Sequence, residues 1–470
     1  MENNLYKHRV TISKKSAVFL VIYLVVFIFT VPKDLEELYL NNYIVDGICL
    51  FLVVFLLCMY SSNYGFDIFD PINFITLIYS FMFFVTPMYD ICTGELTWYG
   101  YNLFRYGVEA TGIAFAGYIA FYLVYIKGNI RYLNVREIRV DEIADRRNLI
   151  LVILVMYGVC FFANAYYMIR YYGTSLSYIL TLGLIGTNVQ GGDSGSIGFI
   201  GMLSYSLPTT VLLYWEYGSS KLLKIILFIP MLMMQITRGF RFFVIQIIVT
   251  FFGYYYIRKG SRPKIIQIFT VCIVMMIPVL LMTLFRDSIR AGAGSDIASV
   301  DTSSLQDAFN SAVWDNFRIY QNFYGMVGVI PSKYPFVYGR QIILGTLVMV
   351  VPRVIWPGKI SSYGGYGLKI LIGSQIGNGQ AYPNLGEYYY AAGIFGVVFF
   401  MVLWGWLLKF MKHRFMSPKQ GGLNNIIFVS LLGANLQLII RGYMPSNFWY
   451  VVFLLIPVWI IKILFNPLVD

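Results

Sequence analysis

Apolar stretches of roughly 20 residues recur along the whole of this chain, and they restrict its possible folds more than any other feature. These runs lack the two-residue alternation of a membrane β-barrel, whereas an α-helix of that length satisfies its own backbone inside a bilayer. Of the 470 residues, 58% are hydrophobic and 12% are charged, and the mean hydropathy is +0.68. Such a balance is too apolar for a set of soluble domains. The sequence therefore predicts an all-α protein that crosses a membrane many times.

The first apolar run, residues 16–31, follows a basic segment and in this respect is similar to a secretory signal. The next residues, 32–35, contain no small-x-small cleavage pattern, so we interpret the run as an uncleaved span. With this run included, about twelve spans are predicted. They cover residues 16–31, 43–60, 72–89, 106–126, 149–169, 197–215, 222–236, 241–257, 265–285, 386–408, 425–440 and 447–465.

A cytoplasmic N-terminus places the segments that are rich in Lys and Arg on one side of the membrane. When the spans alternate from that start, 21 of the 35 Lys and Arg residues lie in cytoplasmic segments, as the positive-inside rule expects. Both ends of the chain are therefore predicted to be cytoplasmic, in a single membrane domain without an internal repeat. One large extracytoplasmic loop is predicted over residues 286–385.

The loop 286–385 is predicted to contain short helices and not a further span. Residues 341–351 are apolar but few, and Pro352 ends them. If they crossed the membrane, the basic segment 409–419 would move outside, so we interpret them as a re-entrant or interfacial piece. Apolar residues also recur at helical spacing over residues 305–317, behind a Thr/Ser cap, which predicts an amphipathic helix near the surface.

Arginine dominates the basic residues of the predicted outer face. Fourteen Lys and Arg residues lie there and ten of them are Arg, although the two types are mixed almost evenly in the cytoplasmic segments. The planar fork of arginine binds phosphate through two parallel hydrogen bonds and keeps its charge at any accessible pH. Any single arginine of this set could instead extend its side chain from a helix end to the lipid head groups, without binding a phosphate ligand. The ten are Arg105, Arg170, Arg238, Arg241, Arg286, Arg290, Arg318, Arg340, Arg353 and Arg441.

Several of these arginines stand where an apolar span ends, so they can meet at one depth of the membrane. They are Arg170, Arg238, Arg241, Arg286, Arg290 and Arg441. An outward-facing cluster of this kind favours a dense anionic group at the membrane surface, and a lipid-linked pyrophosphate fits that description. The net charge of +12 therefore points to a lipid partner and not to nucleic acid.

Glu387 is the candidate acid or base of the outer face. It stands at the start of the predicted span 386–408, where a helix N-terminus stabilises a carboxylate and a reaction near the head groups could use it as a base. The alternative is a carboxylate that caps the helix and pairs with an arginine. Both histidines, His8 and His413, lie in predicted cytoplasmic segments. Chemistry on the outer face must then use a carboxylate or a tyrosine.

Tyrosine is frequent in the predicted outer segments, where it favours the membrane interface, with a minority available to stack on sugar rings. This set comprises Tyr171, Tyr172, Tyr320, Tyr324, Tyr334, Tyr338, Tyr363, Tyr366, Tyr382, Tyr388, Tyr389, Tyr390 and Tyr443. The five cysteines show no CxxC spacing and no histidine cluster nearby, so neither a disulfide nor a metal site is predicted.

Three short segments carry a resemblance to a known family. They are Thr237-Arg238-Gly239-Phe240-Arg241, Pro352-Arg353-Val354-Ile355-Trp356-Pro357-Gly358-Lys359, and Gly386-Glu387-Tyr388 with Gly393 and Gly396 after it. Together with the many spans and one large outer loop in the second half, they resemble the Wzy-type polysaccharide polymerases, also called O-antigen or oligosaccharide repeat-unit polymerases. The resemblance covers the whole architecture.

The resemblance implies an inverting glycosyl transfer at the outer face of the bacterial cytoplasmic (inner) membrane. A growing glycan would leave its undecaprenyl pyrophosphate and join the non-reducing end of the next lipid-linked repeat unit, without a nucleotide sugar, a metal or another cofactor. A chain-length regulator and a flippase are candidate partners. The related ligases are thought to use an outer-loop histidine, which the predicted outer segments of this sequence lack.

The resemblance also implies roles for single residues. Arg238 and Arg241 would hold the donor pyrophosphate while negative charge grows on it. Glu387 would take the proton from the attacking sugar hydroxyl. The residues that would bind the second phosphate or the acceptor are Arg286, Arg290, Arg353 and Arg441.

A flippase for lipid-linked oligosaccharides, or another export transporter, is the main alternative function. Such proteins usually have two comparable halves and ionisable residues near mid-membrane. This sequence shows no repeat and little charge in the middle of its spans, so its charges and its loop favour chemistry at the surface. An acyltransferase is a third reading, disfavoured by the missing outer histidine.

Overall fold

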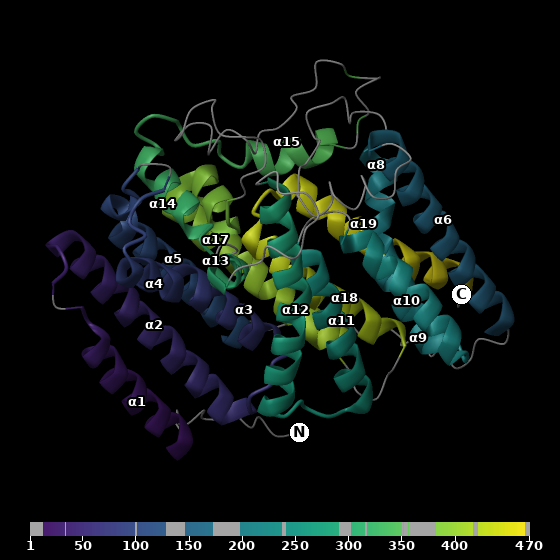
Figure 1. Ribbon diagram of the computed structural model, residues 1–470, viewed down its shortest axis with the longest axis horizontal. Helices are drawn as coiled ribbons and strands as arrows, with labels where there is room; N and C mark the ends of the chain where they lie inside the picture. Colours follow the sequence, from purple (N-terminus) through teal and green to yellow (C-terminus); the bar gives the residue numbers. More distant parts are fainter. Residues whose placement is uncertain are drawn as a thin grey trace, which may run out of the picture.

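The computed structural model describes residues 13–32, 34–98, 101–127, 146–172, 198–236, 241–290, 302–314, 317–349, 351, 356, 382–416 and 422–465. Within these ranges the regular structure is helical, and one isolated bridge joins Trp98 to Tyr101. The all-α prediction is confirmed. The helices (Figure 1) are α1 Lys14–Thr30, α2 Glu37–Tyr64, α3 Pro71–Ser80, α4 Thr86–Thr93, α5 Gly107–Lys127, α6 Arg146–Tyr172, α8 Gly198–Met202, α9 Leu207–Tyr217, α10 Lys221–Ile236, α11 Arg241–Lys259, α12 Ile265–Arg290, α13 Thr302–Trp314, α14 Tyr320–Val329, α15 Arg340–Met349, α17 Asn384–Phe415, α18 Leu423–Ile440 and α19 Met444–Phe465.

Seven helical segments of the described chain are long and apolar enough to cross a membrane. They are Glu37–Tyr64, Pro71–Thr93, Leu103–Lys127, Arg146–Arg170, Asn384–Phe415, Leu423–Ile440 and Met444–Phe465. A π-helical turn, Phe81–Val85, joins α3 to α4 within the second of them. Each segment contains one predicted span, so these seven predictions agree with the structure and the chain is a multi-pass membrane protein.

The other five predicted spans are helical but shorter or more polar, so the count of twelve stays a prediction. α1 has 17 residues and α10 has 16, whereas a spanning helix needs about 20. The span predicted at 197–215 is divided between α8, a 3-10 turn and α9. α11 buries the polar residues Gln246 and Thr250 near its middle, and the apolar part described in α12 is Ile265–Leu280.

The apolar segment 341–351 forms a short helix, as its length suggested. α15 has ten residues and is therefore about 15 Å long, half of the ~30 Å hydrocarbon core. It lies across one end of the bundle, at the top of Figure 1. The helix predicted over 305–317 is present as α13, although it ends at Trp314.

α14 lies inside the bundle, which corrects part of the prediction for the outer tyrosines. Tyr320 and Tyr324 were expected at the membrane interface or against sugars, but both are fully buried. The Tyr320 hydroxyl donates to Asp90 at 2.8 Å, and the Tyr324 hydroxyl lies 2.8 Å from that of Thr111. Arg318, one of the predicted outer arginines, pairs with Asp90 at 2.9 Å. Since α14 is aromatic and apolar, burial stabilises it more than a surface position would.

Glycines allow α5 and α17 to pack closely. A Cβ atom at Gly117 would lie 2.8 Å from Val397 of α17, and one at Gly405 would lie 2.8 Å from the carbonyl of Phe121. Small residues at such a contact let helix backbones approach in a membrane. α17 is thereby held against α5 along much of its length, and the residues of its first turn are held with it.

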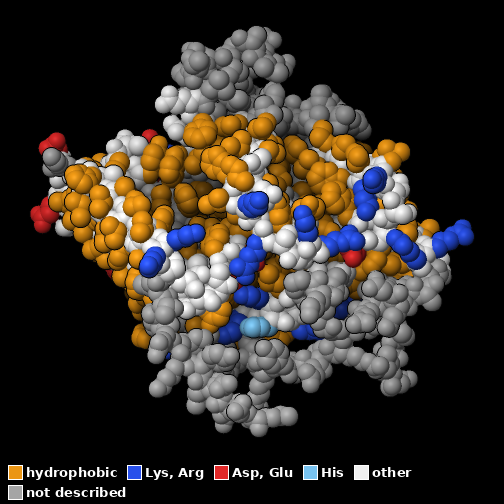
Figure 2. Space-filling view, turned by 90° about the horizontal axis from the view of Figure 1, so that it is seen from below, with side chains coloured by type: hydrophobic (Ala, Val, Ile, Leu, Met, Phe, Trp, Pro, Cys, Tyr) orange, Lys and Arg blue, Asp and Glu red, His pale blue; other side chains and the backbone are white. Residues whose placement is uncertain are grey.

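The described basic residues that were predicted to be cytoplasmic gather at one end of the bundle, where several bind the last carbonyls of helices. Arg146 donates to the Tyr217 carbonyl at 2.9 and 3.1 Å, and Lys409 donates to the Ile126 carbonyl at 3.0 Å. These carbonyls have no partner within their own helix and carry the negative end of its dipole. Figure 2 views the molecule from this side, where Lys and Arg side chains gather between apolar surfaces and few acids are visible. We call this the basic end; its residues are Arg146, Lys224, Arg258, Arg262, Lys409 and Lys412.

Candidate active site

Glu387 lies in the first turn of α17, at the end of the bundle opposite the basic end. α17 starts after Pro383, whose backbone is extended, and the Asn384 side chain is held by the Tyr79 hydroxyl at 2.8 to 2.9 Å. Lys412, at the other end of the same helix, is about 35 Å away at the rise of an α-helix. The start of α17 is therefore fixed in place, far from the charges of the basic end.

A break in α17 separates the turns that carry Glu387 from the rest of the helix. Ala392 and Gly393 leave helical geometry, and Gly393 has φ +62°, a left-handed conformation that favours glycine. The Tyr390 carbonyl next to the break accepts a hydrogen bond from the Val337 N–H at 3.0 Å. A broken helix is tolerated in a membrane protein when the freed backbone groups find partners of this kind.

The turn between α18 and α19 wraps around the start of α17. The Gly442 N–H donates to the Tyr382 carbonyl at 2.7 Å, and a Cβ atom at Gly442 would lie 2.5 Å from the Pro383 carbonyl oxygen. Two residues further on, the Met444 N–H donates to Oε2 of Glu387 at 2.7 Å. Only glycine permits this approach of two backbones, and the approach brings the first residue of α19 to the carboxylate.

Glu387 is a buried carboxylate held by helix N-termini. It is 1% exposed, it belongs to the first turn of α17, and it accepts the first N–H of α19. Both helices present the positive ends of their dipoles to it, which stabilises negative charge. Its second oxygen, Oε1, has no hydrogen-bond partner among the described residues. Oε2 therefore has a structural role, and Oε1 remains able to accept a proton.

The alternative role of Glu387, a carboxylate that caps its helix and pairs with an arginine, is found only in part. Capping is present, although the capped helix is α19 and not its own. The described residues provide no arginine or lysine within ion-pair distance of this carboxylate. Burial, followed by the negative charge of Glu387, raises the pKa of Tyr443 to about 12. Its hydroxyl therefore stays protonated beside the carboxylate at neutral pH.

Arg441 is the one candidate arginine whose side chain the structure describes. It ends α18, three residues before Met444, and its guanidinium lies 5.0 Å from the centre of the Phe242 ring. Phe242 follows Arg241 in the first turn of α11, so Arg441 reaches the start of that helix. Asn447 also donates to the Arg441 carbonyl and braces the turn. The fold thus brings α18, α19, α17 and the beginning of α11 to one place.

The other candidate arginines are placed less fully. The backbones of Arg241, Arg286 and Arg290 lie at the first position of α11 and near the end of α12, and their side chains lie outside the described part. Arg238 and Arg353 lie outside the described residues altogether. Their convergence with Arg441 therefore stays a prediction.

Three arginines outside the candidate set lie on the surface of the described chain. Arg105, Arg170 and Arg340 are exposed, as expected for side chains that reach toward lipid head groups. Sequence reasoning missed Gln341, a buried residue beside Tyr382. Its only signal was a polar residue at the start of the apolar segment 341–351.

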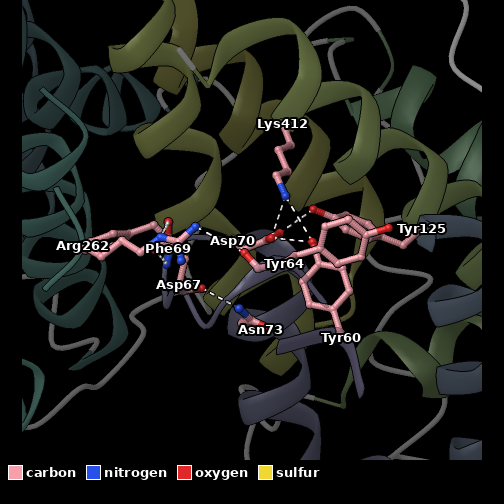
Figure 3. Close-up of polar contacts among 9 residues, drawn as sticks. All are labelled: Tyr60, Tyr64, Asp67, Phe69, Asp70, Asn73, Tyr125, Arg262 and Lys412. Atoms are coloured by element: carbon pink, nitrogen blue, oxygen red, sulfur yellow. Dashed lines mark hydrogen bonds and ion pairs between the residues drawn. The ribbon is translucent and has the colours of Figure 1, made fainter. Parts of the chain in front are cut away.

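A second polar cluster lies at the basic end (Figure 3). Asp70 accepts hydrogen bonds from the Tyr60 and Tyr125 hydroxyls and from the Lys412 ammonium, each at 2.6 Å. Lys412 also lies 5.9 Å from the centres of both tyrosine rings. Both carboxylate oxygens of Asp70 are occupied, so the cluster fastens α2, α3, α5 and α17 together.

The fold and the site define a multi-pass helical membrane protein with a buried carboxylate at one end of its bundle, one oxygen of which lacks a partner among the described residues. The family described as O-antigen polysaccharide polymerase Wzy matches residues 13–467, and the chain belongs to this family. Searches of curated proteins and of solved structures found no match. The resemblance seen in the sequence is confirmed, and with it a role in polysaccharide biosynthesis as a membrane polymerase of O-antigen repeat units.

Proposed function

We propose that this protein joins oligosaccharide repeat units carried on undecaprenyl pyrophosphate, at the outer face of the bacterial cytoplasmic membrane. The observation that carries the proposal is that Oε1 of Glu387, in a buried site between helix N-termini, has no partner in the part of the chain that the structure describes. A general base must be held in place while one of its oxygens stays available for a proton. Glu387 meets both conditions within a family of membrane polymerases.

The reaction is a single displacement at the anomeric carbon of the donor glycan. A hydroxyl oxygen at the non-reducing end of the acceptor repeat unit forms the new bond to that carbon. The bond from the carbon to the pyrophosphate oxygen breaks, and undecaprenyl pyrophosphate leaves with the electron pair. The hydroxyl proton passes to Oε1 of Glu387. Because attack and departure occur on opposite sides, the anomeric configuration inverts.

The pyrophosphate is assigned to the arginines. Arg238 and Arg241 stabilise the charge that grows on the leaving group, in the manner of preorganised cationic donors. The position of Arg441 beside Phe242 supports this assignment, because the guanidinium reaches the helix that Arg241 begins. The second phosphate or the acceptor lipid is assigned to Arg286, Arg290, Arg353 and Arg441.

The orientation and the partners belong to the same proposal. Both termini and the basic end face the cytoplasm, where Lys and Arg are favoured. Glu387 and the segment 286–385 then face outward. A flippase that delivers the repeat unit and a regulator of chain length are the proposed protein partners, and no cofactor is required for the displacement.

The test supplies the purified full-length protein with a lipid-linked repeat unit in vesicles, without nucleotide sugar. We expect a ladder of glycans that grow by one repeat unit at a time, with release of undecaprenyl pyrophosphate. The rival transporter function predicts movement of intact substrate between leaflets and no ladder. That result would overturn the proposal.

A further inference from the structure

Gln341 carries a second buried acceptor oxygen, and its side chain contacts Tyr382, which precedes α17. It lies at the start of α15 and is 1% exposed. Its Nε2 donates to the Tyr382 hydroxyl at 3.1 Å, whereas its Oε1 has no partner among the described residues. A buried amide oxygen without a donor costs free energy, so its retention calls for an explanation.

Tyr382 connects Gln341 to the α17 and α19 side of the site. Its hydroxyl accepts from Gln341, and its carbonyl accepts from Gly442 in the α18–α19 turn. A Cβ atom at Gly386, the residue before Glu387, would lie 3.4 Å from the Tyr382 ring, so this ring packs against the turn that carries Glu387. Tyr382 therefore contacts both Gln341 and the first turn of α17, which carries Glu387.

α15 is fastened to the first turns of α19, whose first N–H holds Glu387. A Cβ atom at Gly345 would lie 2.9 Å from the Pro445 ring, and the Trp449 indole N–H donates to the Thr346 carbonyl at 3.0 Å. Gly345 follows Gln341 by one turn, so both lie on the same face of α15. The position of Gln341 relative to Glu387 is consequently set by packed helices.

The two unpaired atoms select the chemistry of the ligand. Oε1 of Glu387 and Oε1 of Gln341 are both acceptors, so a ligand must bring two hydrogen-bond donors. A phosphate brings only acceptors and negative charge, and the carboxylate would repel it. A sugar ring with two hydroxyls satisfies both oxygens. The pyrophosphate then belongs on the side of Arg441, and the sugar on the side of α15.

We propose that Glu387 and Gln341 form the subsite for the acceptor sugar of the polymerisation reaction, and this inference rests on the function proposed above. The attacking hydroxyl donates to Glu387, and a second hydroxyl of the same sugar donates to Gln341. Gln341 is thus a specificity-determining residue, which orients the ring so that the correct hydroxyl faces the base. A site built to accept a substrate hydroxyl rejects an analogue that lacks it.

The experiment uses acceptor repeat units that each lack one hydroxyl of the non-reducing-end sugar, with the natural lipid-linked donor. The wild-type protein should lose at least about 100-fold in kcat/KM with two of these analogues, one for the attacking position and one for a second position. If only the attacking hydroxyl matters, the subsite does not exist. This comparison needs no variant, so it stands even where a substitution impairs folding.

The substitution Gln341→Met tests whether Gln341 is the residue that binds the second hydroxyl of the acceptor sugar. We expect KM for the intact acceptor to rise about 10- to 100-fold, and the second analogue to become as good as the intact acceptor. Tyr382→Phe removes the bond from Gln341 to the tyrosine but keeps Oε1, so it should retain discrimination. Gln321→Met is the matched control, because Gln321 is a buried glutamine of α14 whose Oε1 also lacks a partner in the described chain.

Failure of the inference and failure of the proposed function give different results. If Gln341→Met still rejects the second analogue, Gln341 does not read the acceptor, whereas ladder formation by the wild-type protein stands. If the wild-type protein makes no ladder, or Glu387→Gln makes a normal one, the polymerase mechanism itself falls.

Discussion

Glu387 has two oxygens with different tasks, and this division can be tested. Oε2 accepts the first N–H of α19 at 2.7 Å, while Oε1 lacks a partner among the described residues. A glutamine keeps an oxygen for the N–H of Met444 but cannot take up a proton. An alanine removes both functions. The two substitutions therefore separate catalysis from stability.

We expect Glu387→Gln to abolish glycan ladders while the membrane level and the melting temperature remain near those of the wild-type protein. Glu387→Ala should also abolish ladders, and it should lower stability by about 1–3 kcal/mol because the N–H of Met444 loses its acceptor. Thermal unfolding of the purified proteins in detergent checks the difference. Equal melting temperatures for the two variants would contradict the structural role of Oε2.

At the scale of the residue, the sequence predicted Glu387 from its place at the start of an apolar run. It could not show which helix the carboxylate caps, because Met444 lies 57 residues away in the chain. Gln341 was missed for a related reason. Nothing local distinguishes a buried glutamine with an unpaired oxygen from one that water satisfies.

At the scale of the element, the span that α17 forms was predicted correctly, but the structure of this helix differs from the prediction in one detail. The apolar run predicted one continuous helix over 386–408, and the structure has a helix over Asn384–Phe415 that breaks at Ala392 and Gly393. Gly393 had been singled out only as part of the family resemblance, and no break was predicted from it. Hydropathy alone does not register a break, because the residues on both sides are equally apolar.

Gly393→Ala should destabilise the break. An alanine there must adopt a left-handed φ of +62°, and its Cβ would lie 3.0 Å from the Phe336 ring. We expect a loss of about 1–3 kcal/mol and shorter ladders, since the turns that carry Glu387 depend on the break. Gly112→Ala in α5 is the control, because a Cβ atom there meets nothing within 4 Å. If both variants had similar melting temperatures, position 393 would accept a side chain without strain, which would contradict this prediction.

At the scale of the whole molecule, the bundle has two chemically different ends. One end holds basic side chains on the last carbonyls of helices and a saturated Asp70 cluster (Figures 2 and 3). The other end holds Glu387, Gln341 and Arg441. The positive-inside rule predicts that the basic end faces the cytoplasm, and the proposed reaction requires the same orientation.

Single cysteines test this orientation. The first cysteine, Ser332→Cys, replaces a residue on an exposed turn after α14, at the Glu387 end of the bundle. The second, Ser417→Cys, replaces a residue between α17 and α18 in the chain. In a background with the two exposed cysteines, Cys92 and Cys272, replaced by serine, an impermeant thiol reagent should label position 332 in intact cells and position 417 only after permeabilisation. The reverse pattern would place Glu387 in the cytoplasm and exclude the outer-face reaction.

The sequence by itself determined that this protein lies in a membrane, and it predicted which end of the protein faces the cytoplasm. Long apolar runs force helices in a bilayer, and uneven basic residues favour one orientation, because both effects depend on composition along the chain. The tertiary structure decided which polar groups meet. It buried Tyr320 and Tyr324, paired Arg318 with Asp90, and placed Gln341 against Tyr382. Such pairings depend on helices distant in sequence packing together, and no local pattern records them.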